Sequence, residues 1–274
     1  SINDQPADEW LEKTERLIRN SNNIKILKNT LVTTYNFSDH LIALEDKNVG
    51  KPQDNEKPEL VLHKIRTKHT ILANGHIERF ITFRNNDLPG VMLAASFEKY
   101  LNRYGVVPDE SPVIFTNNSS TYSLLKSLTD LGHKPKAYVD IRDQKNIEKE
   151  TVDLLEKFNI PFYPKSEIEG CEGQKEVKKV SIRTKKNQIS KIKTSMLCVS
   201  GGFNPDIHLF TQSKGLLKWD KDHLTFKPDR IFQKTITLGS VSGNFSYEKL
   251  LVEVEKKLSA FEGLNKLEVK FELN

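Results

Sequence analysis

The sequence predicts an α/β fold built on parallel strands, and three observations support this prediction. Strand-like apolar runs alternate with helical patterns between Val113 and Tyr163, which is typical of a parallel sheet with right-handed crossovers. Several other apolar runs stop at a glycine, and backbone exposed at the carboxyl end of a buried strand is where open α/β sheets bind ligands. Residues 24–73 show short β-branched and aromatic runs typical of a small meander. The strand-then-glycine runs end at Gly75, Gly201 and Gly239.

Composition narrows the class of protein. The chain has 274 residues, which is long enough for two domains. Its 42 Lys+Arg and 37 Asp+Glu give a net charge of +5, and this surplus is a weak sign of an anionic partner. Two cysteines without C-x-x-C spacing predict a reducing compartment. The histidines have no metal-ligand spacing, so we expect no metal site. No apolar run reaches the ~20 residues of a membrane span and no signal peptide begins the sequence, so we expect a cytoplasmic protein without a membrane partner.

The first half of the chain is predicted to form one helix, a meander and a strand–loop–helix segment. A helix is predicted over Ala7–Asn20, with Asp4 or Asp8 as its cap. The strand–loop–helix segment begins with a buried strand, Thr70–Ala73, and continues into a helix that begins at Pro89 after Asp87 and ends at Gly105. The predicted meander strands are Ile24–Leu27, Leu31–Phe37, His40–Leu44 and Leu60–Arg66.

The second half begins after a linker predicted at 108–112. Val177–Ile182 and Ile189–Ile192 are read as a hairpin, whose outward lysines indicate a solvated face; without interleaved aromatics, no nucleic-acid partner is expected. Phe203–Asp206 is read as a turn. The other predicted elements are strands at Val113–Phe115, Lys136–Asp140, Ile160–Tyr163 and Leu267–Leu273, and helices at Ser120–Leu131, Asn146–Phe158 and Tyr247–Phe261.

A nucleotide-binding turn is predicted between Asn117 and Tyr122, after a strand and before a helix. The three positions of a G-x-G-x-x-G fingerprint hold Asn117, Ser119 and Tyr122 instead of glycine, and these glycines serve the tight turn, the approach to pyrophosphate and helix packing. Asp140, however, stands where the ribose-binding acid belongs. Two interpretations stay open: a degenerate, non-binding Rossmann unit, or an altered but working site.

Catalytic signals are weak. Glu78-Arg79 is read either as a pair that orients a cofactor or an interface, or as a loop ion pair. No Ser-His-Asp or Cys-His arrangement and no P-loop stands out in the sequence. We therefore expect no catalytic residue in this chain.

Five strings in chain order carry a family resemblance. They are Leu72–Arg79, Asn86–Ala94, Tyr100–Val106, Phe115–Ser119 and Val199–Ser213. The chain resembles the alpha subunit of heterotetrameric sarcosine oxidase from about Ile24 to Phe261. The strings Asn-Asp-Leu-Pro-Gly-Val-Met and Ser-Gly-Gly-Phe-Asn-Pro are the most specific.

The resemblance implies an α/β fold with two dinucleotide-binding-like, Rossmann-type, three-layer domains and a small β meander. Residues 1–107 and 206–274 would be two segments of the first domain, and 108–205 an inserted NAD(P)-binding-like Rossmann domain. In the family, the alpha subunit holds NAD in the first domain and contacts the beta subunit. The full complex carries FAD and FMN, and demethylates sarcosine oxidatively with tetrahydrofolate and oxygen.

The family's strand-end motifs imply which residues lie near the dinucleotide. These are Asn74, Gly75, Gly239 and Ser240, although Ser240 replaces the acid of more general flavoprotein relatives. The family's glycine fingerprint is expected before Ser1 and its folate-handling region after Asn274. We therefore expect a piece of the subunit, with its first domain truncated at the N-terminus and inactive by itself.

Three functional hypotheses follow. The first is that the chain holds NAD and assembles subunits as part of a sarcosine oxidase alpha subunit. The second is an NAD(P)H-dependent oxidoreductase domain like the flavin disulfide reductases, with Asn117–Tyr122 as its working nucleotide site. The third is a non-catalytic scaffold.

Overall fold

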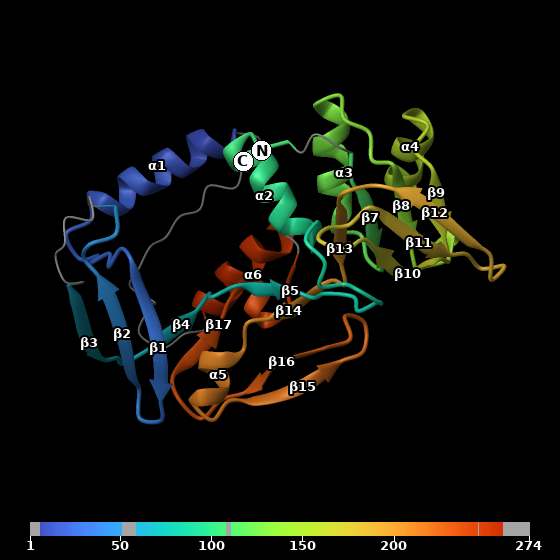
Figure 1. Cartoon of the computed structure of the whole chain (residues 1–274). Helices are drawn as coiled ribbons and strands as arrows, with labels where there is room; N and C mark the ends of the chain where they lie inside the picture. Colours follow the sequence, from blue (N-terminus) through green and yellow to red (C-terminus); the bar gives the residue numbers. More distant parts are fainter. Residues whose placement is uncertain (1–5, 51–58, 108–110, 246, 260–274) are drawn as a thin grey trace. The chain divides into compact units, whose positions relative to one another are not determined.

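The computed structural model describes residues 6–50, 59–107, 111–245 and 247–259 (Figure 1). The chain divides into two compact units. The first unit comprises Ser1–Gly75, Asp206–Trp219 and Phe226–Asn274, and the second comprises His76–Pro205 and Asp220–Thr225.

The second unit is built on a five-stranded parallel sheet. Its order is β6-β13-β7-β8-β9, so the chain moves outward from β7 through β8 to β9 on one side and places β13 and β6 on the other. All four residues of β7, of β8 and of β13 are buried, as expected for strands covered on both faces. The strands are β6 Val91–Leu93, β7 Val113–Thr116, β8 Ala137–Asp140, β9 Phe162–Pro164 and β13 Leu197–Ser200.

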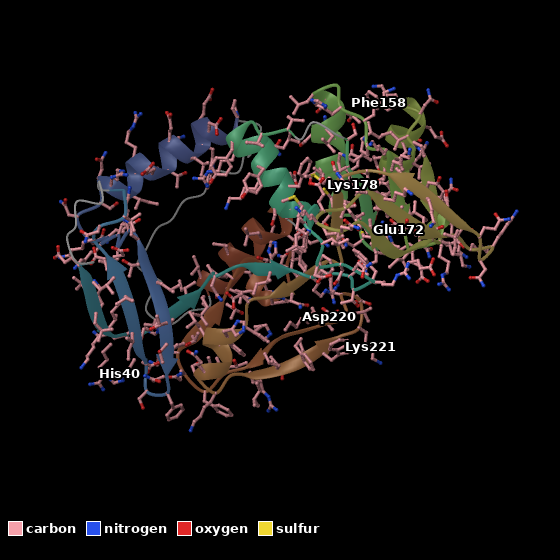
Figure 2. The ribbon with its side chains drawn as sticks, viewed as in Figure 1. His40, Phe158, Glu172, Lys178, Asp220 and Lys221 are labelled. Carbon is pink, nitrogen blue, oxygen red and sulfur yellow. The ribbon has the colours of Figure 1, made fainter. Side chains whose placement is uncertain are left out.

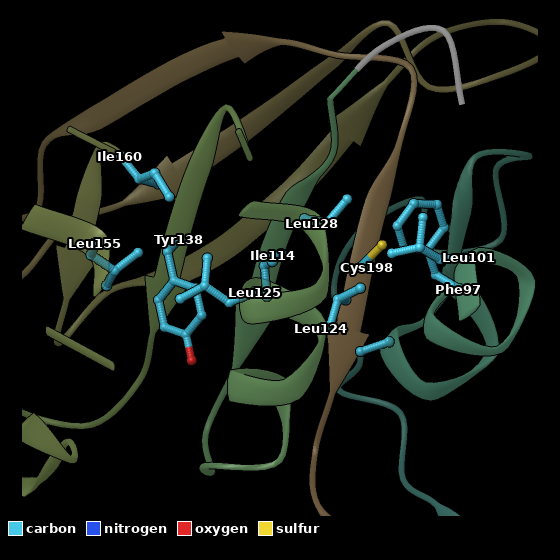
Figure 3. Packing of buried hydrophobic residues seen from close by; sticks show 11 residues of the cluster. Phe97, Leu101, Ile114, Leu124, Leu125, Leu128, Tyr138, Leu155, Ile160 and Cys198 are labelled. Carbon is cyan, nitrogen blue, oxygen red and sulfur yellow. The ribbon is translucent and has the colours of Figure 1, made fainter. Parts of the chain in front are cut away.

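Helices cover one face of this sheet. Ile114, Tyr138 and Cys198 point to that face and pack with helical leucines such as Leu124 and Leu128 (Figure 3). This layer confirms the predicted alternation of strand and helix. The helices are α2 Ala94–Tyr104, α3 Thr121–Asp130 and α4 Lys149–Lys157, with a short 3-10 turn, η1, at Gln144–Asn146.

An antiparallel sheet covers the other face. Val113 and Phe115 alternate with Ile114 along β7, so they point the opposite way and pack against residues such as Ile182. The unit therefore has three layers, helix, parallel sheet and antiparallel sheet. The covering strands are β10 Glu167–Glu172, β11 Lys179–Arg183 and β12 Ile189–Lys193, and β11–β12 is the predicted hairpin. A further pair, β5 His76–Glu78 and β14 Phe203–Pro205, is antiparallel.

The first unit combines the predicted meander with a short parallel pair. In the pair, β4 and β17 run in register from Thr70 opposite Thr235 to Leu72 opposite Thr237. Its core holds Tyr35, Leu72 and Phe210, and the Tyr35 hydroxyl lies 2.5 Å from Thr235 Oγ1. The strands are β1 Thr30–Asn36, β2 His40–Asp46, β3 Leu60–Arg66, β4 Thr70–Leu72, β15 Leu216–Asp220, β16 Thr225–Arg230 and β17 Thr235–Thr237. The helices are α1 Ala7–Arg19, α5 His208–Gln212, η2 Gly239–Ser242 and α6 Tyr247–Ser259.

The predicted start of a helix at Pro89 is wrong. Val91–Leu93 forms strand β6, paired in parallel with β13, and helix α2 begins only at Ala94. Gly90 explains the difference, because its φ of +104° excludes helical backbone and its carbonyl accepts a 2.9 Å hydrogen bond from the Leu197 amide. The predicted end at Gly105, in the left-handed conformation, is confirmed.

Other local predictions are wrong because strand pairing is not visible in the local sequence. One predicted strand has no partner strand, and one predicted turn is paired with a strand from another part of the chain. Ile24–Leu27 forms no strand, and Phe203–Pro205 is a strand rather than a turn because β5 pairs with it. Asp8 lies inside the first turn of α1 and does not cap it. Asp4, most of the predicted 108–112 linker and the strand predicted at Leu267–Leu273 lie outside the described residues.

Candidate dinucleotide site

Asn74 and Gly75 form the turn that leaves the carboxyl end of β4. Asn74 Nδ2 donates to the Asp206 carbonyl oxygen at 2.6 Å, and the Asp206 amide donates to the Gly75 carbonyl at 3.1 Å. Gly75 has a φ of +90°, and no atom lies within 4 Å of where a Cβ would stand. The turn is thus held from one side and open at the glycine, which leaves room for a ligand to approach the backbone.

Gly239 and Ser240 leave the carboxyl end of β17, beside β4. The Leu238 amide donates to the Leu72 carbonyl at 2.9 Å, so the parallel pairing continues up to the two turns. Gly239 has a φ of +76°. The four predicted residues therefore lie at the same end of one parallel pair, in two turns that each contain a glycine with positive φ.

Glu253 on helix α6 reaches the Gly239 turn, and the sequence reasoning missed it. Its carboxylate accepts from the Gly239 amide at 3.3 Å and from Ser242 Oγ at 2.6 Å. Burial works against the charge, but hydrogen bonds from Lys257, Ser242 and Asn244 outweigh it and lower the pKa of Glu253. Both oxygens of Glu253 already accept hydrogen bonds, from Gly239, Ser242, Asn244 and Lys257, so this carboxylate holds the Gly239 turn in place, and its charge disfavours a phosphate there. The Gly75 side is the open approach to the backbone.

The Asn117–Tyr122 turn in the second unit is closed by its own side chains. It lies where the strand order reverses, between β7 and β13. Asn118 Nδ2 donates to the Ser200 carbonyl at 3.1 Å, and Asn118 Oδ1 accepts from the Ser120 amide at 2.9 Å. The asparagine thus takes up backbone groups at the position where a fingerprint turn would present them to a pyrophosphate.

Asp140, at the end of β8, is fully buried and paired with Arg142. Arg142 Nη2 donates to Oδ2 at 2.9 Å, Nε to Oδ1 at 3.1 Å, and the Arg142 amide to Oδ1 at 2.8 Å. Burial raises the pKa of Asp140 despite these bonds. Because both oxygens already accept hydrogen bonds, this acid is not presented to a ribose.

Arg142 also joins a second carboxylate at the same turn. Its Nη1 donates to Ser119 Oγ at 3.0 Å and lies 3.6 Å from Glu148 Oε2, and Ser119 Oγ donates to Glu148 as well. Burial opposes the charge of Glu148, but hydrogen bonds, including the one from Ser119, and the charge of Arg142 outweigh it and lower the pKa of Glu148. A protein carboxylate therefore occupies the anion position of this turn.

Glu78 and Arg79 are positioned by different partners. Glu78 Oε2 accepts from the Ala95 amide at 2.9 Å, in the first turn of α2, and Arg79 donates to the carbonyls of His223 and Leu224 at 3.0 and 2.7 Å. Glu78 also lines a cavity of about 200 Å³ in the second unit together with Glu98. Burial raises the pKa of both carboxyls.

Three basic side chains of the hairpin face, Lys178, Arg183 and Lys191, are paired with neighbouring acids. Glu172 and Lys178, labelled in Figure 2, lie on this side of the second unit. Lys191 Nζ lies 2.5 Å from Glu172 Oε1, and Arg183 Nη2 lies 2.7 Å from Glu169 Oε1. This pairing is consistent with the interpretation of a solvated face.

Two further features, a metal site and a membrane-spanning helix, are absent from the described part of the chain. No group of three or more His, Cys, Asp or Glu side chains there is arranged to hold a metal ion. None of the helices in that part is both long enough and apolar enough to cross a membrane.

The fold is that of dinucleotide-binding oxidoreductases, as predicted. Bacillithiol disulfide reductase from Staphylococcus aureus superposes with a TM-score of 0.60 at 11% identity, covering 86% of this chain and 68% of that one. Thioredoxin reductase from T. acidophilum gives 0.57 at 15% identity, covering 82% and 69%. L-Proline dehydrogenase from P. horikoshii gives 0.56 at 20% identity, covering 84% and 40%.

In sequence, the chain is similar to sarcosine oxidase alpha subunits, which confirms the predicted resemblance. The subunit from Corynebacterium sp. (strain U-96) is 29% identical over 248 residues, covering 86% of this chain and 25% of the relative. That from Rhizobium meliloti (strain 1021) is 28% identical over 236 residues, covering 82% and 22%. The chain thus spans about a quarter of the length of these relatives. No protein-family model matches the chain.

Proposed function

We propose that this chain is the dinucleotide-fold region of a sarcosine oxidase alpha-type subunit, and that it holds NAD at the Asn74–Gly75 and Gly239–Ser240 turns. One observation carries the proposal. Two glycine turns lie at the same end of the β4–β17 pair, in a chain similar to these subunits over more than four-fifths of its length. Carboxyl ends of parallel strands are where this class of sheet binds nucleotides.

Gly75 and Glu253 have different roles in the proposed NAD site. The open backbone at Gly75 admits the phosphates. Glu253, whose carboxylate accepts hydrogen bonds from the Gly239 amide, Ser242 and Lys257, fixes the shape of the Gly239 turn. NAD bound there would supply hydride-acceptor chemistry, but Asn74, Gly75, Gly239 and Ser240 carry no ionisable acid or base. The region therefore holds a cofactor and does not perform the reaction.

The wider role follows from the resemblance. In this proposal the chain works in the cytoplasm, assembles with a beta-type subunit, and belongs to a complex that also carries FAD and FMN. That complex oxidatively demethylates sarcosine with tetrahydrofolate and oxygen. The names of the relatives support an oxidoreductase of several subunits.

Calorimetric titration with NAD tests the binding site. A Cβ at Gly75 enters the approach to the backbone, so Gly75→Val is expected to weaken NAD binding at least about tenfold. Gly50→Val is the matched control, because Gly50 lies in the same unit with a φ of +82° and equally open surroundings. Equal loss in both variants, or none in either, would contradict the proposed site.

A second candidate is pyridine-nucleotide binding by the second unit, favoured by the strand order and by Asp140 at the end of β8. The Arg142 contacts argue against it. Titration with NADPH separates the two candidates, since binding that is abolished by Asp140→Ala and unaffected by Gly75→Val would favour the second unit. A non-catalytic scaffold is the remaining alternative, and it predicts no binding of either nucleotide.

A further inference from the structure

The segment between β4 and β5 contains the only Asn-Gly pair in the sequence, Asn74-Gly75. Asn74 is exposed to solvent, and Gly75 is partly exposed. An asparagine side-chain amide is open to attack by the backbone nitrogen of the next residue. A glycine in that position favours the attack, because it has no side chain to hinder the approach and its backbone rotates easily.

The Gly75 amide is available as the attacking group. Among the described residues it donates a hydrogen bond to no group, whereas the Gly75 carbonyl accepts from the Asp206 amide at 3.1 Å. Gly75 has a φ of +90°, and no atom lies within 4 Å of where a Cβ would stand. No hydrogen bond of this amide therefore has to break before its nitrogen reacts, and no neighbouring side chain crowds it.

The Asn20-Ser21 pair in the same unit lacks these properties. Asn20 is exposed, as Asn74 is. The Ser21 amide, however, donates to the Ile18 carbonyl at 3.2 Å, and Ser21 carries a side chain next to the attacking nitrogen. The two asparagines therefore differ in the backbone that follows them and not in exposure.

The Asn74 side chain lies against Asp206. Its Nδ2 donates to the Asp206 carbonyl oxygen at 2.6 Å. Burial opposes the charge of the Asp206 side chain, but hydrogen bonds, including those from His208 and Asn74, outweigh it and lower the pKa of Asp206. A carboxylate in place of the Asn74 amide would lose the donor and face an ionised acid of the same charge.

We propose that Asn74 is a site of spontaneous deamidation in the folded chain. Hydroxide removes the proton of the Gly75 amide, the nitrogen forms a bond to Cγ of Asn74, and the Cγ–Nδ2 bond breaks as ammonia leaves with a proton from water. Water then opens the succinimide ring at either of its carbonyls, which gives aspartate or isoaspartate. The reaction needs only water and base, and it adds a negative charge to the turn.

The product would alter the proposed NAD site, and this consequence rests on the proposed function. A carboxylate at position 74 stands beside the backbone at which the phosphates approach Gly75, and it repels them. Isoaspartate also lengthens the main chain between Asn74 and Gly75 by a methylene group. The fully converted chain is therefore expected to bind NAD at least about tenfold more weakly than the fresh chain.

Peptide mass spectrometry tests the modification without NAD. Trypsin releases residues 69–79, in which Asn74 is the only side-chain amide, so a change in mass from amide to acid reports on this site alone. In the folded chain at pH 8, Asn74 is expected to convert at least about tenfold faster than Asn20, because the Ser21 amide must first break its hydrogen bond.

Two glycine variants separate the local chemistry from a general effect on the fold. Gly75→Ala places a side chain next to the attacking nitrogen and is expected to slow the conversion of Asn74. Gly50→Ala is the matched control, because Gly50 has a φ of +82° and equally open surroundings, and it should leave the rate unchanged. Equal rates in the two variants would overturn the proposal.

Two further results would also overturn it. One is conversion of Asn74 no faster than that of Asn20. The other is conversion more than about tenfold slower in the folded chain than in guanidinium chloride, which would mean that the contact with Asp206 protects the amide. The loss of NAD affinity is measured separately, by calorimetry of converted and fresh chains. A fresh chain that binds no NAD would contradict the proposed function alone, since the mass measurement does not depend on NAD.

Discussion

Removing the Arg142 guanidinium should destabilise the second unit strongly. Asp140 is fully buried, and the Arg142 side chain donates three hydrogen bonds to its carboxylate, at 2.9, 3.1 and 3.3 Å. In Arg142→Met, the only one of these hydrogen bonds that remains to the Asp140 carboxylate is the one from the backbone amide of residue 142, at 2.8 Å. Breaking a buried ion pair from one side costs about 3–5 kcal/mol, and because the Arg142 side chain is 20% exposed we expect about 3 kcal/mol at pH 7.

The stability deficit of Arg142→Met should depend on pH, because it depends on the charge of Asp140. Burial already raises the pKa of Asp140 in the folded chain, and loss of the guanidinium raises it further. The folded variant then binds a proton more readily than the unfolded chain, so its stability falls as pH rises from the unfolded carboxyl pKa through the raised folded one. The stability deficit of Arg142→Met should therefore shrink as pH is lowered toward 4.

Urea unfolding followed by circular dichroism measures this deficit, because Trp10 and Trp219 both lie in the first unit and do not report on the second. The control is Arg142→Met in an Asp140→Asn background, where no buried charge remains and the deficit should be smaller. A loss below about 1 kcal/mol at pH 7, or one that grows in acid, would refute the assigned role of the pair.

Three further predictions concern the second unit. Burial raises the pKa of Glu78 from 4.5, so its contribution to stability is lost as pH rises above that value; Glu78→Gln should flatten the fall of melting temperature between pH 4 and 8, and an unchanged slope would contradict this. A Cβ at Gly90 would lie 2.2 Å from the Ser195 carbonyl oxygen, so Gly90→Ala should lower the free energy of urea unfolding by at least about 3 kcal/mol. The control Gly105→Ala, at a glycine with open surroundings, should lower it by only about 1 kcal/mol. Burial raises the pKa of the Cys171 thiol to about 11, so Ellman's reagent should react at pH 8 only on unfolding, and rapid reaction of the native chain would show otherwise.

The sequence predicts the fold correctly where the local pattern of apolar residues fits only one kind of element, and that element is the one which tertiary packing stabilises. Strands β7 and β8 each have three apolar residues followed by one polar residue, and all four residues of each strand are buried, so the local sequence is enough to predict them. Val91–Leu93 is different, because its apolar residues fit a helix as well as a strand. The choice is made by Gly90 and by the Leu197 amide, which lies far away in sequence.

The candidate site shows the same division. Gly75 and Gly239 are visible in the sequence because each follows an apolar run, and the β4–β17 pairing brings them together. Glu253 could not be found in this way, since it lies on a helix and only the return of α6 brings it to the Gly239 amide. Asp140 was visible at its strand end, but its pairing with Arg142 depends on burial that local spacing does not reveal.

Amide hydrogen exchange with and without NAD shows where on the chain the nucleotide is held. We expect slower exchange at residues 73–76 and 238–242 when NAD is added, and no change at 117–122. Slower exchange at 117–122 and 140–142 alone would mean that the second unit holds the nucleotide. That result, or no change anywhere along the chain, would contradict NAD binding at the Gly75 and Gly239 turns.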